Sequence, residues 1–425
     1  SLLSGISSLN YNYGAKYFLT LSFRVDGSSK FSPSNRWAPF WSVGGSWIIS
    51  DESFMKPVSW INLLKLRGSY GTSGNSDIDD YLYMQLYSFG RNYMDEPGST
   101  LSTMGNEDLT WEKNHNADLG IEMKFFKRFN LSVDVYNRKT FDLLLAVPVS
   151  MTTGYENQMR NVGSMVNRGV ELSLATTVIN SDKFNWVSTL TFARNHNEIL
   201  DLYGSDTIIV STKIRTVGQA LQTFYLAEWA GVNSADGSPM WYDENGNLTK
   251  DYNQARKVIA GNADPKFTAG WTNNLTYGNW ALNFMFYCSY GNLIFNQLNN
   301  ELISDGATTE LNQSATAMDY WKQPGDNASN PKVVQNNGSN SNRFSTRYLE
   351  DGSYIRLKNI QLSYTLPSQA CEKIKLSRCM IYAQVQNPFV WTKFTGLDPE
   401  TRSNGIYYYD YPKQRLFLMG LNLSF

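Results

Sequence analysis

Apolar and polar residues alternate one by one along many short segments of this chain, and helical periodicity is almost absent. From Met419 to Phe425 every second residue is large and apolar, and small or polar residues lie between them. The segment from Ala117 to Phe125 repeats this pattern, with Asp118 and Glu122 among the intervening residues. Since successive side chains of a strand point to opposite faces, this period of two predicts strands with one apolar and one polar face.

About 13 strands are expected from this pattern. Their predicted ranges are 1–13, 16–26, 37–50, 63–71, 113–125, 128–140, 166–179, 183–197, 266–277, 280–291, 353–366, 379–391 and 415–425. Short turns alternate with long loops, which are expected at 27–36, 71–112, 141–165, 198–265, 292–352 and 392–414. Short connections on one side and long ones on the other are typical of bacterial outer-membrane barrels. We therefore predict an all-β fold, a transmembrane antiparallel β-barrel with long extracellular loops.

The faces of the predicted strands fit a barrel wall. Leu21, Leu119, Leu172, Phe284 and Leu421 are expected to face lipid, and the polar residues Asp118, Glu122 and Glu171 are expected to face a wet interior, because they would be costly in lipid. One long loop is also expected to contain a hairpin, from Met240 to Leu248, with Asn245–Gly246 as its tight turn.

Composition supports the same class of protein. Aromatic residues make up 14% of the chain although its mean hydropathy is −0.39. Only alternate residues of a barrel strand face lipid, and its long loops are polar, so a barrel reconciles these two values. The net charge of −1 argues against a nucleic-acid partner, which would require a basic face.

Residues that carry chemistry are sparse. The two histidines, His115 and His196, are far apart and lack zinc-ligand spacing. No nucleophile elbow and no obvious carboxylate dyad occurs. We therefore expect no enzyme activity, catalytic site, metal or cofactor. Cys371 and Cys379 either form a disulfide or remain as two partly buried thiols, and the sequence leaves both alternatives open.

Several long stretches resemble a known family, the SusC/RagA group of TonB-dependent outer-membrane transporters of Bacteroidetes. The matching stretches are LNYNYGAKYFLTLSFRVDGSSKF (9–31), LKLRGSYGTSGN (64–75), LTWEKNHNADLGIEMKFF (109–126), VDVYNRKTFDLLL (133–145), NVGSMVNRGVEL (161–172), ADPKFTAG (263–270), YLEDGSYIRLKNIQLSYTLP (348–367) and QNPFVWTKFTGLDPE (386–400). The resemblance covers nearly all of the chain, from about Leu9 to Phe425.

The resemblance implies a barrel of about 22 strands with an internal plug. It implies location in the outer membrane of a Gram-negative bacterium and contact with outer-membrane lipid. It also implies a SusD-like surface lipoprotein as a lid, energy coupling through TonB, and import of oligosaccharides or peptides. Aromatic residues of the long loops are the candidate substrate contacts, and the alternative is that they pack the loops together or contact the lid protein. They are Trp229, Trp241, Tyr242, Trp321, Tyr407, Tyr408 and Tyr409.

Strand parity leads to an expectation about completeness. The last strand of such a barrel ends in the periplasm, and counting back places the start of strand 1–13 outside the cell. A bacterial single-chain barrel has an even strand number and starts from the periplasm. Residues 1–425 are therefore expected to be the C-terminal portion of one barrel domain. The plug domain, the TonB contact and an odd number of strands, about nine, are expected outside this chain. The alternative function is a structural or adhesion barrel without transport.

Overall fold

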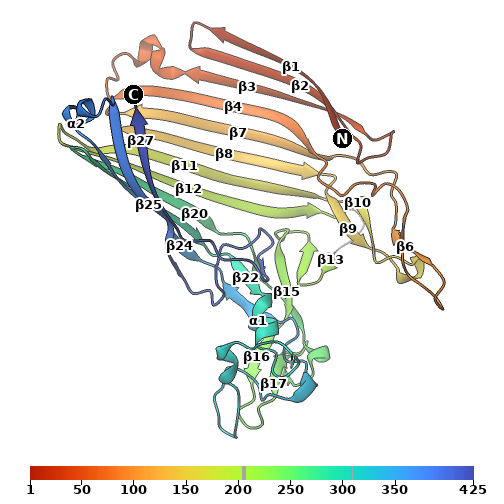
Figure 1. Ribbon diagram of the computed structural model, residues 1–425. Helices are drawn as coiled ribbons and strands as arrows, with labels where there is room; N and C mark the ends of the chain where they lie inside the picture. The colour runs from red at the N-terminus through yellow and green to blue at the C-terminus, as the bar shows by residue number, and fades with distance from the viewer. Residues whose placement is uncertain (203–206, 309) are drawn as a thin grey trace. The chain divides into compact units, whose positions relative to one another are not determined.

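Thirteen long strands dominate the computed structural model, which describes residues 1–202, 207–308 and 310–425 (Figure 1). They form one antiparallel sheet in the order in which they occur along the chain. The strands are β1 (Leu2–Tyr13), β2 (Tyr17–Ser28), β3 (Trp37–Ile48), β4 (Ile61–Asn75), β7 (Glu112–Phe125), β8 (Phe129–Phe141), β11 (Ser164–Asn180), β12 (Phe184–Asp201), β20 (Phe267–Tyr277), β21 (Trp280–Tyr290), β24 (Tyr354–Thr365), β25 (Arg378–Thr392) and β27 (Leu416–Ser424). Each strand predicted from alternation is present, and its ends differ from the prediction by a few residues.

Two compact units divide the chain. The first comprises residues 1–178, 187–208 and 216–221, and it contains β1 to β8, most of β11 and most of β12. The second comprises residues 179–186, 209–215 and 222–425, and it contains the long strands β20 to β27.

The connections have the predicted lengths, and the long ones contain small elements of their own. The minor strands are β5 (Leu86–Phe89), β6 (Ser99–Thr103), β9 (Leu144–Pro148), β10 (Asn157–Asn161), β13 (Thr207–Val210), β14 (Lys213–Thr216), β15 (Thr223–Ala227), β16 (Trp229–Val232), β17 (Pro239–Tyr242), β18 (Leu248–Thr249), β19 (Lys257–Asn262), β22 (Leu293–Asn296), β23 (Leu349–Asp351) and β26 (Ile406–Tyr407). The α-helices are α1 (Gln297–Leu302) and α2 (Ser368–Lys373). The 3-10 helices are η1 (Ile49–Asp51), η2 (Ser53–Met55), η3 (Met151–Thr153), η4 (Tyr252–Gln254), η5 (Ala315–Met318), η6 (Gln335–Asn337) and η7 (Thr346–Tyr348). Parts of the predicted loops 198–265 and 292–352, namely residues 203–206 and 309, lie outside the described residues. Within the described ranges, no helix is long and apolar enough to cross a membrane.

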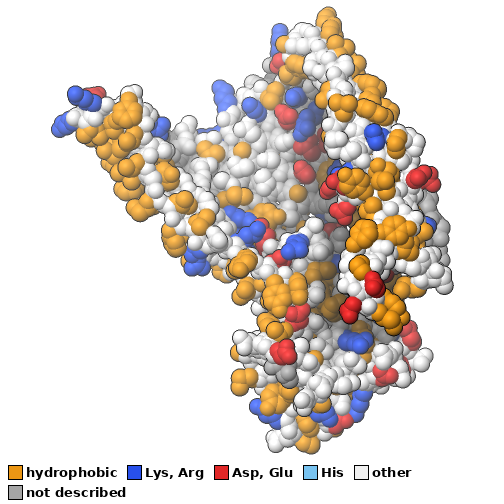
Figure 2. Space-filling model, turned by 45° about the vertical axis from the view of Figure 1, so that its right-hand side comes forward, with side chains coloured by type: hydrophobic (Ala, Val, Ile, Leu, Met, Phe, Trp, Pro, Cys, Tyr) orange, Lys and Arg blue, Asp and Glu red, His pale blue; other side chains and the backbone are white. Residues whose placement is uncertain are grey.

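Strand register confirms the two predicted faces, because residues paired across neighbouring strands lie on the same face. Leu119 pairs with Val135, and Leu172 pairs with Val133. In the second unit, Leu421 pairs with Ile381. Leu21 and Phe284 likewise have apolar partners, Val43 and Ile360. Hydrophobic side chains form patches on the visible surface, and charged side chains lie between and beside these patches (Figure 2).

The predicted hairpin is present, but its turn differs from the prediction. Tyr242 pairs with Leu248, as expected. A two-residue type I′ turn requires positive φ at both central residues. Here Gly246 has a φ of 81°, whereas Asn245 is not among the residues with positive φ. The Asp243 carboxylate instead accepts hydrogen bonds from the backbone N–H groups of Asn245 and Asn247, which stabilises a longer turn.

Hydrophobic cores lie where the long loops fold against the ends of the wall strands. In the first unit, Phe31, Phe40, Leu109 and Trp111 form such a core. In the second unit, Phe224 and Phe295 are fully buried in another. These cores fix the loops at one end of the strands, so polar side chains on the loops are held in defined positions.

Candidate functional site

Arg67 is the centre of an ion-pair cluster on the polar face of the first unit. Its guanidinium lies 2.5 Å from the Asp134 carboxylate, 3.3 Å from Glu122 and 3.8 Å from Asp118. Lys65, two residues earlier on β4, lies 3.7 Å from Glu122. These residues come from three adjacent strands, β4, β7 and β8, and their side chains remain partly exposed. The predicted polar placement of Asp118 and Glu122 is therefore confirmed.

Gly120 allows this cluster to form. In the register, Gly120 lies between Arg67 on β4 and Asp134 on β8. A Cβ atom at Gly120 would come within 2.3 Å of the Asp134 carboxylate and 2.8 Å of the Arg67 Nε. The ion pair therefore crosses over β7 at the one residue without a side chain. Glu171 pairs with Asp134 on the next strand, β11, so the same polar face continues.

A second charged cluster joins strand β24 to the last long loop of the second unit. The buried Arg356 guanidinium pairs with the Asp398 carboxylate. Lys358 lies 2.7 Å from Glu400, which also approaches the Arg356 Nε at 3.4 Å. The other Asp398 oxygen accepts a hydrogen bond from the backbone N–H of Lys413. These contacts hold the loop at both of its ends.

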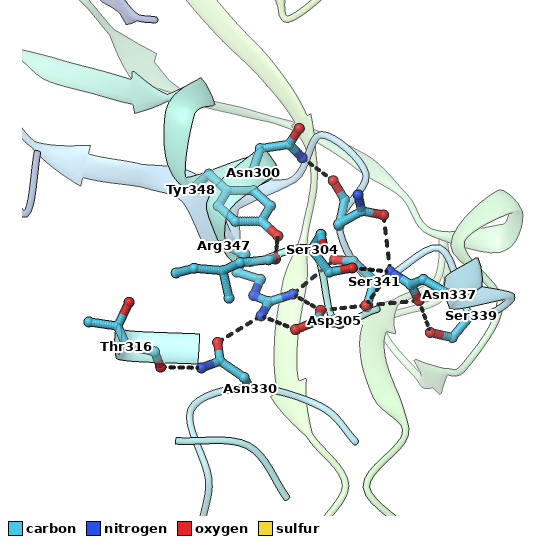
Figure 3. Close-up of polar contacts among 12 residues, drawn as sticks. Asn300, Ser304, Asp305, Thr316, Asn330, Asn337, Ser339, Ser341, Arg347 and Tyr348 are labelled. Carbon is cyan, nitrogen blue, oxygen red and sulfur yellow. Dashed lines mark hydrogen bonds and ion pairs between the residues drawn. The ribbon is translucent and has the colours of Figure 1, made fainter. Parts of the chain in front are cut away.

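A third cluster lies inside the loop between β21 and β24 (Figure 3). Arg347 donates two hydrogen bonds to Asp305, at 2.6 and 3.1 Å, and one to the Asn330 side chain at 2.8 Å. Its side chain is 7% exposed, and that of Asp305 is 2% exposed. Burial is the largest influence on the pKa of Arg347 and acts to lower it, but the hydrogen bonds to Asp305 and the charge interactions with Tyr348 and Asp305 together outweigh burial and raise that pKa. Ser341 donates a further hydrogen bond to Asp305.

Lys213, on β14 of the second unit, has a buried amine, and its polar contacts compensate little for the loss of hydration. It donates a hydrogen bond to the Gln222 carbonyl at 2.9 Å and lies 3.2 Å from the centre of the Phe224 ring. Burial lowers its pKa to about 7, and the charge of the nearby Asp264 carboxylate opposes this shift in part. Burial also raises the pKa of Asp264.

Four of the predicted aromatic residues, Trp229, Trp241, Tyr242 and Trp321, make packing contacts within the loops of the second unit. Trp241 is fully buried, and Trp229 packs against it edge to face at 5.5 Å. The Arg347 guanidinium lies 5.0 Å from the Trp229 ring, and the Arg256 guanidinium lies 5.6 Å from the Tyr242 ring. The indole N–H of Trp321 donates a hydrogen bond to the Ser234 carbonyl. Trp241 therefore presents no ring face to a ligand.

The three consecutive tyrosines occupy different environments. Tyr407 is 1% exposed and packs edge to face on Phe394. Tyr408 and Tyr409 are exposed, and their rings lie 4.6 Å apart, nearly perpendicular. The Tyr409 hydroxyl donates a hydrogen bond to Glu301, which raises the pKa of Tyr409. Of the seven predicted residues, Tyr408 and Tyr409 offer the most accessible rings.

Sequence patterns did not reveal the partners of the buried arginines Arg347 and Arg356, because these lie 42 residues away along the chain. For Arg356 a signal existed: YIRLKN and GLDPE, within two of the family-like stretches, supply the two sides of its cluster. Cys371 and Cys379 are both buried and free, so the disulfide alternative is not formed. Among the described residues, no group of three or more potential ligands is placed to hold a metal ion.

The chain matches one protein-family model, described as "TonB dependent receptor-like, beta-barrel", over residues 7–387. It is 32% identical to TonB-dependent receptor P3 of Formosa agariphila over 464 aligned residues, which cover 100% of this chain and 45% of that protein. It is also 32% identical to TonB-dependent receptor SusC of Bacteroides thetaiotaomicron, covering 100% of this chain and 44% of that protein.

A solved structure described as the RagAB peptide transporter matches with a TM-score of 0.87 and 30% identity, over 100% of this chain and 48% of that one. The chain thus spans slightly less than half the length of the curated relatives described above.

Proposed function

Because this chain belongs to the TonB-dependent receptor-like β-barrel family, we propose that it is part of an outer-membrane importer energised through TonB. The observation that carries the proposal is the two-faced sheet. Apolar residues pair with apolar residues on one face, and the Arg67 cluster occupies the other. Charged side chains on the lipid face of a barrel cost about 2–4 kcal/mol at the midplane, so the polar face is the one that suits a wet passage. Membership in a family of receptors agrees with the expectation that the chain is not an enzyme.

The edges of the sheet support the proposal that this chain is one portion of a larger barrel. Strands β1 and β27 are the two edge strands. In lipid, each backbone group left without a hydrogen bond costs several kcal/mol, so barrels close without edges. We propose that both edges pair with further strands of the same transporter, and that the plug and the TonB contact belong to that other portion.

The proposed partner is a SusD-like surface lipoprotein, and the proposed substrates are oligosaccharides or peptides. Relatives named SusC and RagAB support this pairing. The packed loops of the second unit support it as well, because the Arg347 and Arg356 clusters give them fixed surfaces. Tyr408 and Tyr409 remain the proposed substrate contacts, since exposed aromatic rings stack on sugar rings and on peptide side chains.

The test uses cells that carry the complete transporter. They are given a panel of fluorescent oligosaccharides and peptides, and internal fluorescence is measured with and without a functional TonB gene. We expect uptake of at least one probe, and its loss without TonB. Equal uptake in both strains would contradict energised import, and no uptake of any probe would favour the structural or adhesion barrel.

A further inference from the structure

Positive charge gathers on the apolar face of the first unit, at the end of the strands that carries the long loops. Three adjacent strands each contribute one cation, namely Lys139 on β8, Arg168 on β11 and Arg194 on β12, and we call these three residues the rim cluster. Alternation along β8 places Lys139 and Asn137 on the same face as Val135. Arg168 pairs with Asn137 across the strands, so it shares this face.

Contacts between β11 and β12 place Arg194 on the same face. Glu198 lies 3.1 Å from Arg168 and so belongs to the apolar face. Asn195 instead donates a hydrogen bond to Asn167, which precedes Arg168 and therefore lies on the polar face. Because Arg194 precedes Asn195, its side chain points to the opposite face, which is that of Glu198.

A row of aromatic residues marks the level of the rim cluster along the strands. The Trp41 and Tyr70 rings lie 5.7 Å apart, and the Tyr70 hydroxyl lies 2.9 Å from the His115 Nδ1. His115 packs edge to face on Phe141 at 5.2 Å, and the Lys139 amine lies 4.7 Å from the centre of the same ring. Aromatic residues of barrels gather at the membrane interfaces, so this row places the cluster at the level of lipid headgroups.

Apolar side chains continue from this row along the same face. Leu119, Val135 and Leu190 are 56%, 54% and 47% exposed. Side chains of this kind on a barrel wall are covered by the acyl chains of lipids. A lipid whose chains lie on these residues would therefore bring its headgroup against the rim cluster.

The chain neutralises the rim cluster only in part. Within β7, β8, β11 and β12, all of whose residues are described, Glu198 is the one carboxylate on the apolar face. It pairs with Arg168, and among the described residues no carboxylate pairs with Lys139 or Arg194. Three cations and one carboxylate leave a net charge of +2. The Arg67 cluster on the polar face differs, because three carboxylates surround its arginine.

This charge matches one phosphate group. A phosphomonoester carries a charge of about −1.5 to −2 at pH 7 and offers three acceptor oxygens. Guanidinium groups bind phosphate through paired hydrogen bonds, and both arginines of the cluster are exposed. A zwitterionic headgroup fits less well, since its own cation would add to the positive charge already present.

We propose that the rim cluster binds a phosphomonoester on the headgroup of an outer-leaflet lipid, whose acyl chains lie against Leu119, Val135 and Leu190. The inference rests on the proposed function in one respect, namely that the apolar face lies in the outer membrane. It goes beyond that function by assigning a lipid site to the outside of the wall, away from the polar face.

Native mass spectrometry of the complete transporter in a neutral detergent measures lipid binding directly. The probe is lipid A that carries one phosphomonoester, and the comparison is the same lipid A after removal of the phosphate. The wild-type protein should bind the phosphorylated form about tenfold more tightly or better, because several cations face the phosphate. Arg168→Gln combined with Arg194→Gln should abolish most of this preference. Asn137→Asp is a second variant, which weakens the preference by adding a carboxylate among the cations while all three remain.

Arg138→Gln combined with Arg160→Gln is the matched control, because it removes the same charge elsewhere in the first unit. Arg138 is exposed and adjoins Lys139 on β8 but lies on the opposite face, and Arg160 is exposed on β10. This control should keep the preference of the wild type. Heat-modified mobility in detergent gels shows whether each variant forms a folded barrel.

Equal binding of the two lipids by the wild type would overturn the site, as would an unchanged preference in the folded Arg168→Gln, Arg194→Gln and Asn137→Asp proteins. Displacement of the lipid by an equal concentration of inorganic phosphate would indicate a general anion site and overturn the lipid assignment. A change in oligomeric mass without a change in lipid binding would assign the surface to a second copy of the chain and overturn it too. None of these measurements involves TonB or uptake, so failure of the lipid site is distinguishable from failure of energised import.

Discussion

Replacement of Arg347 by methionine tests whether the buried ion pair organises the loop between β21 and β24. Methionine keeps an unbranched side chain of similar length but removes all four hydrogen bonds of the guanidinium to Asp305, Asn330 and Ser341. Asp305 would remain buried, with Ser341 as its one remaining side-chain donor. Breaking a buried pair by removal of one partner costs about 3–5 kcal/mol, because a buried charge is left without compensation.

Hydrogen exchange of two loop amides measures this cost. The Val334 N–H donates to the Asp305 carbonyl, and the Asn336 N–H donates to the Gly306 carbonyl. If they exchange through opening of the loop, a loss of about 3 kcal/mol accelerates them more than about a hundredfold. The Asp243 N–H, bonded to the Asn247 carbonyl in the β17–β18 hairpin, should keep its rate.

Arg343→Met is the control, since Arg343 is exposed and lies 5.6 Å from the Tyr252 ring, a contact worth about 1 kcal/mol or less. Replacing both charges, as Arg347→Met with Asp305→Leu, should restore part of the protection, because no unpaired charge remains. Exchange that changes less than about tenfold in the single Arg347→Met variant would refute the reasoning.

Three further predictions concern other parts of the chain. Burial lowers the pKa of Lys213 in the folded protein from 10.5 to about 7, so between these pH values the unfolded loop binds more protons, and the stability of the wild-type loop should rise with pH. At pH 6, Lys213→Met should therefore make the loop more stable against protease than the wild type, by about 1 kcal/mol or more. This gain should shrink toward pH 10. Leu119→Arg on the apolar face should destabilise the folded barrel by about 2–4 kcal/mol in a denaturant titration, whereas Ser132→Arg on the polar face should cost less, and equal losses would mean that the faces are misassigned. Cys288, Cys371 and Cys379 should react as three free thiols after unfolding without a reductant, and a count of one would reveal a disulfide.

The strands were predictable because their two faces have different surroundings, so apolar and polar residues alternate along each strand. The segment from Ala117 to Phe125 shows this, since its alternation identified β7 and assigned Asp118 and Glu122 to the polar face. Asn273 shows the limit of the pattern. It lies in register with Phe284 among apolar positions of β20, yet it is fully buried and accepts a hydrogen bond from the Trp186 indole.

The candidate site was less predictable, because the loops fold around contacts between distant residues. Composition marked Trp241 and Tyr407 as loop aromatics, but composition does not distinguish a ring that binds a ligand from one that fills a core. Both are buried here. Asp26 lies in one of the family-like stretches, but its buried Oδ1 atom, which has no hydrogen-bond partner, depends on the positions of its neighbours, which the sequence does not give.

The solvent exposure of each charged cluster determines how strongly salt weakens its ion pairs and how costly the loss of one partner is. The side chains of Arg67 and Glu122 are 36% and 37% exposed, so salt screens their attraction and the pair contributes about 1 kcal/mol or less. The side chains of Arg356 and Asp398 are 3% and 7% exposed, so water and salt reach them poorly and loss of either leaves an unpaired buried charge. The partly exposed charges on the polar face can therefore exchange ion-pair partners at little cost in free energy. The buried charges in the loops cannot do so without destabilising the loops. This difference suits a proposed importer, whose passage must contact changing partners while its loops present a fixed surface.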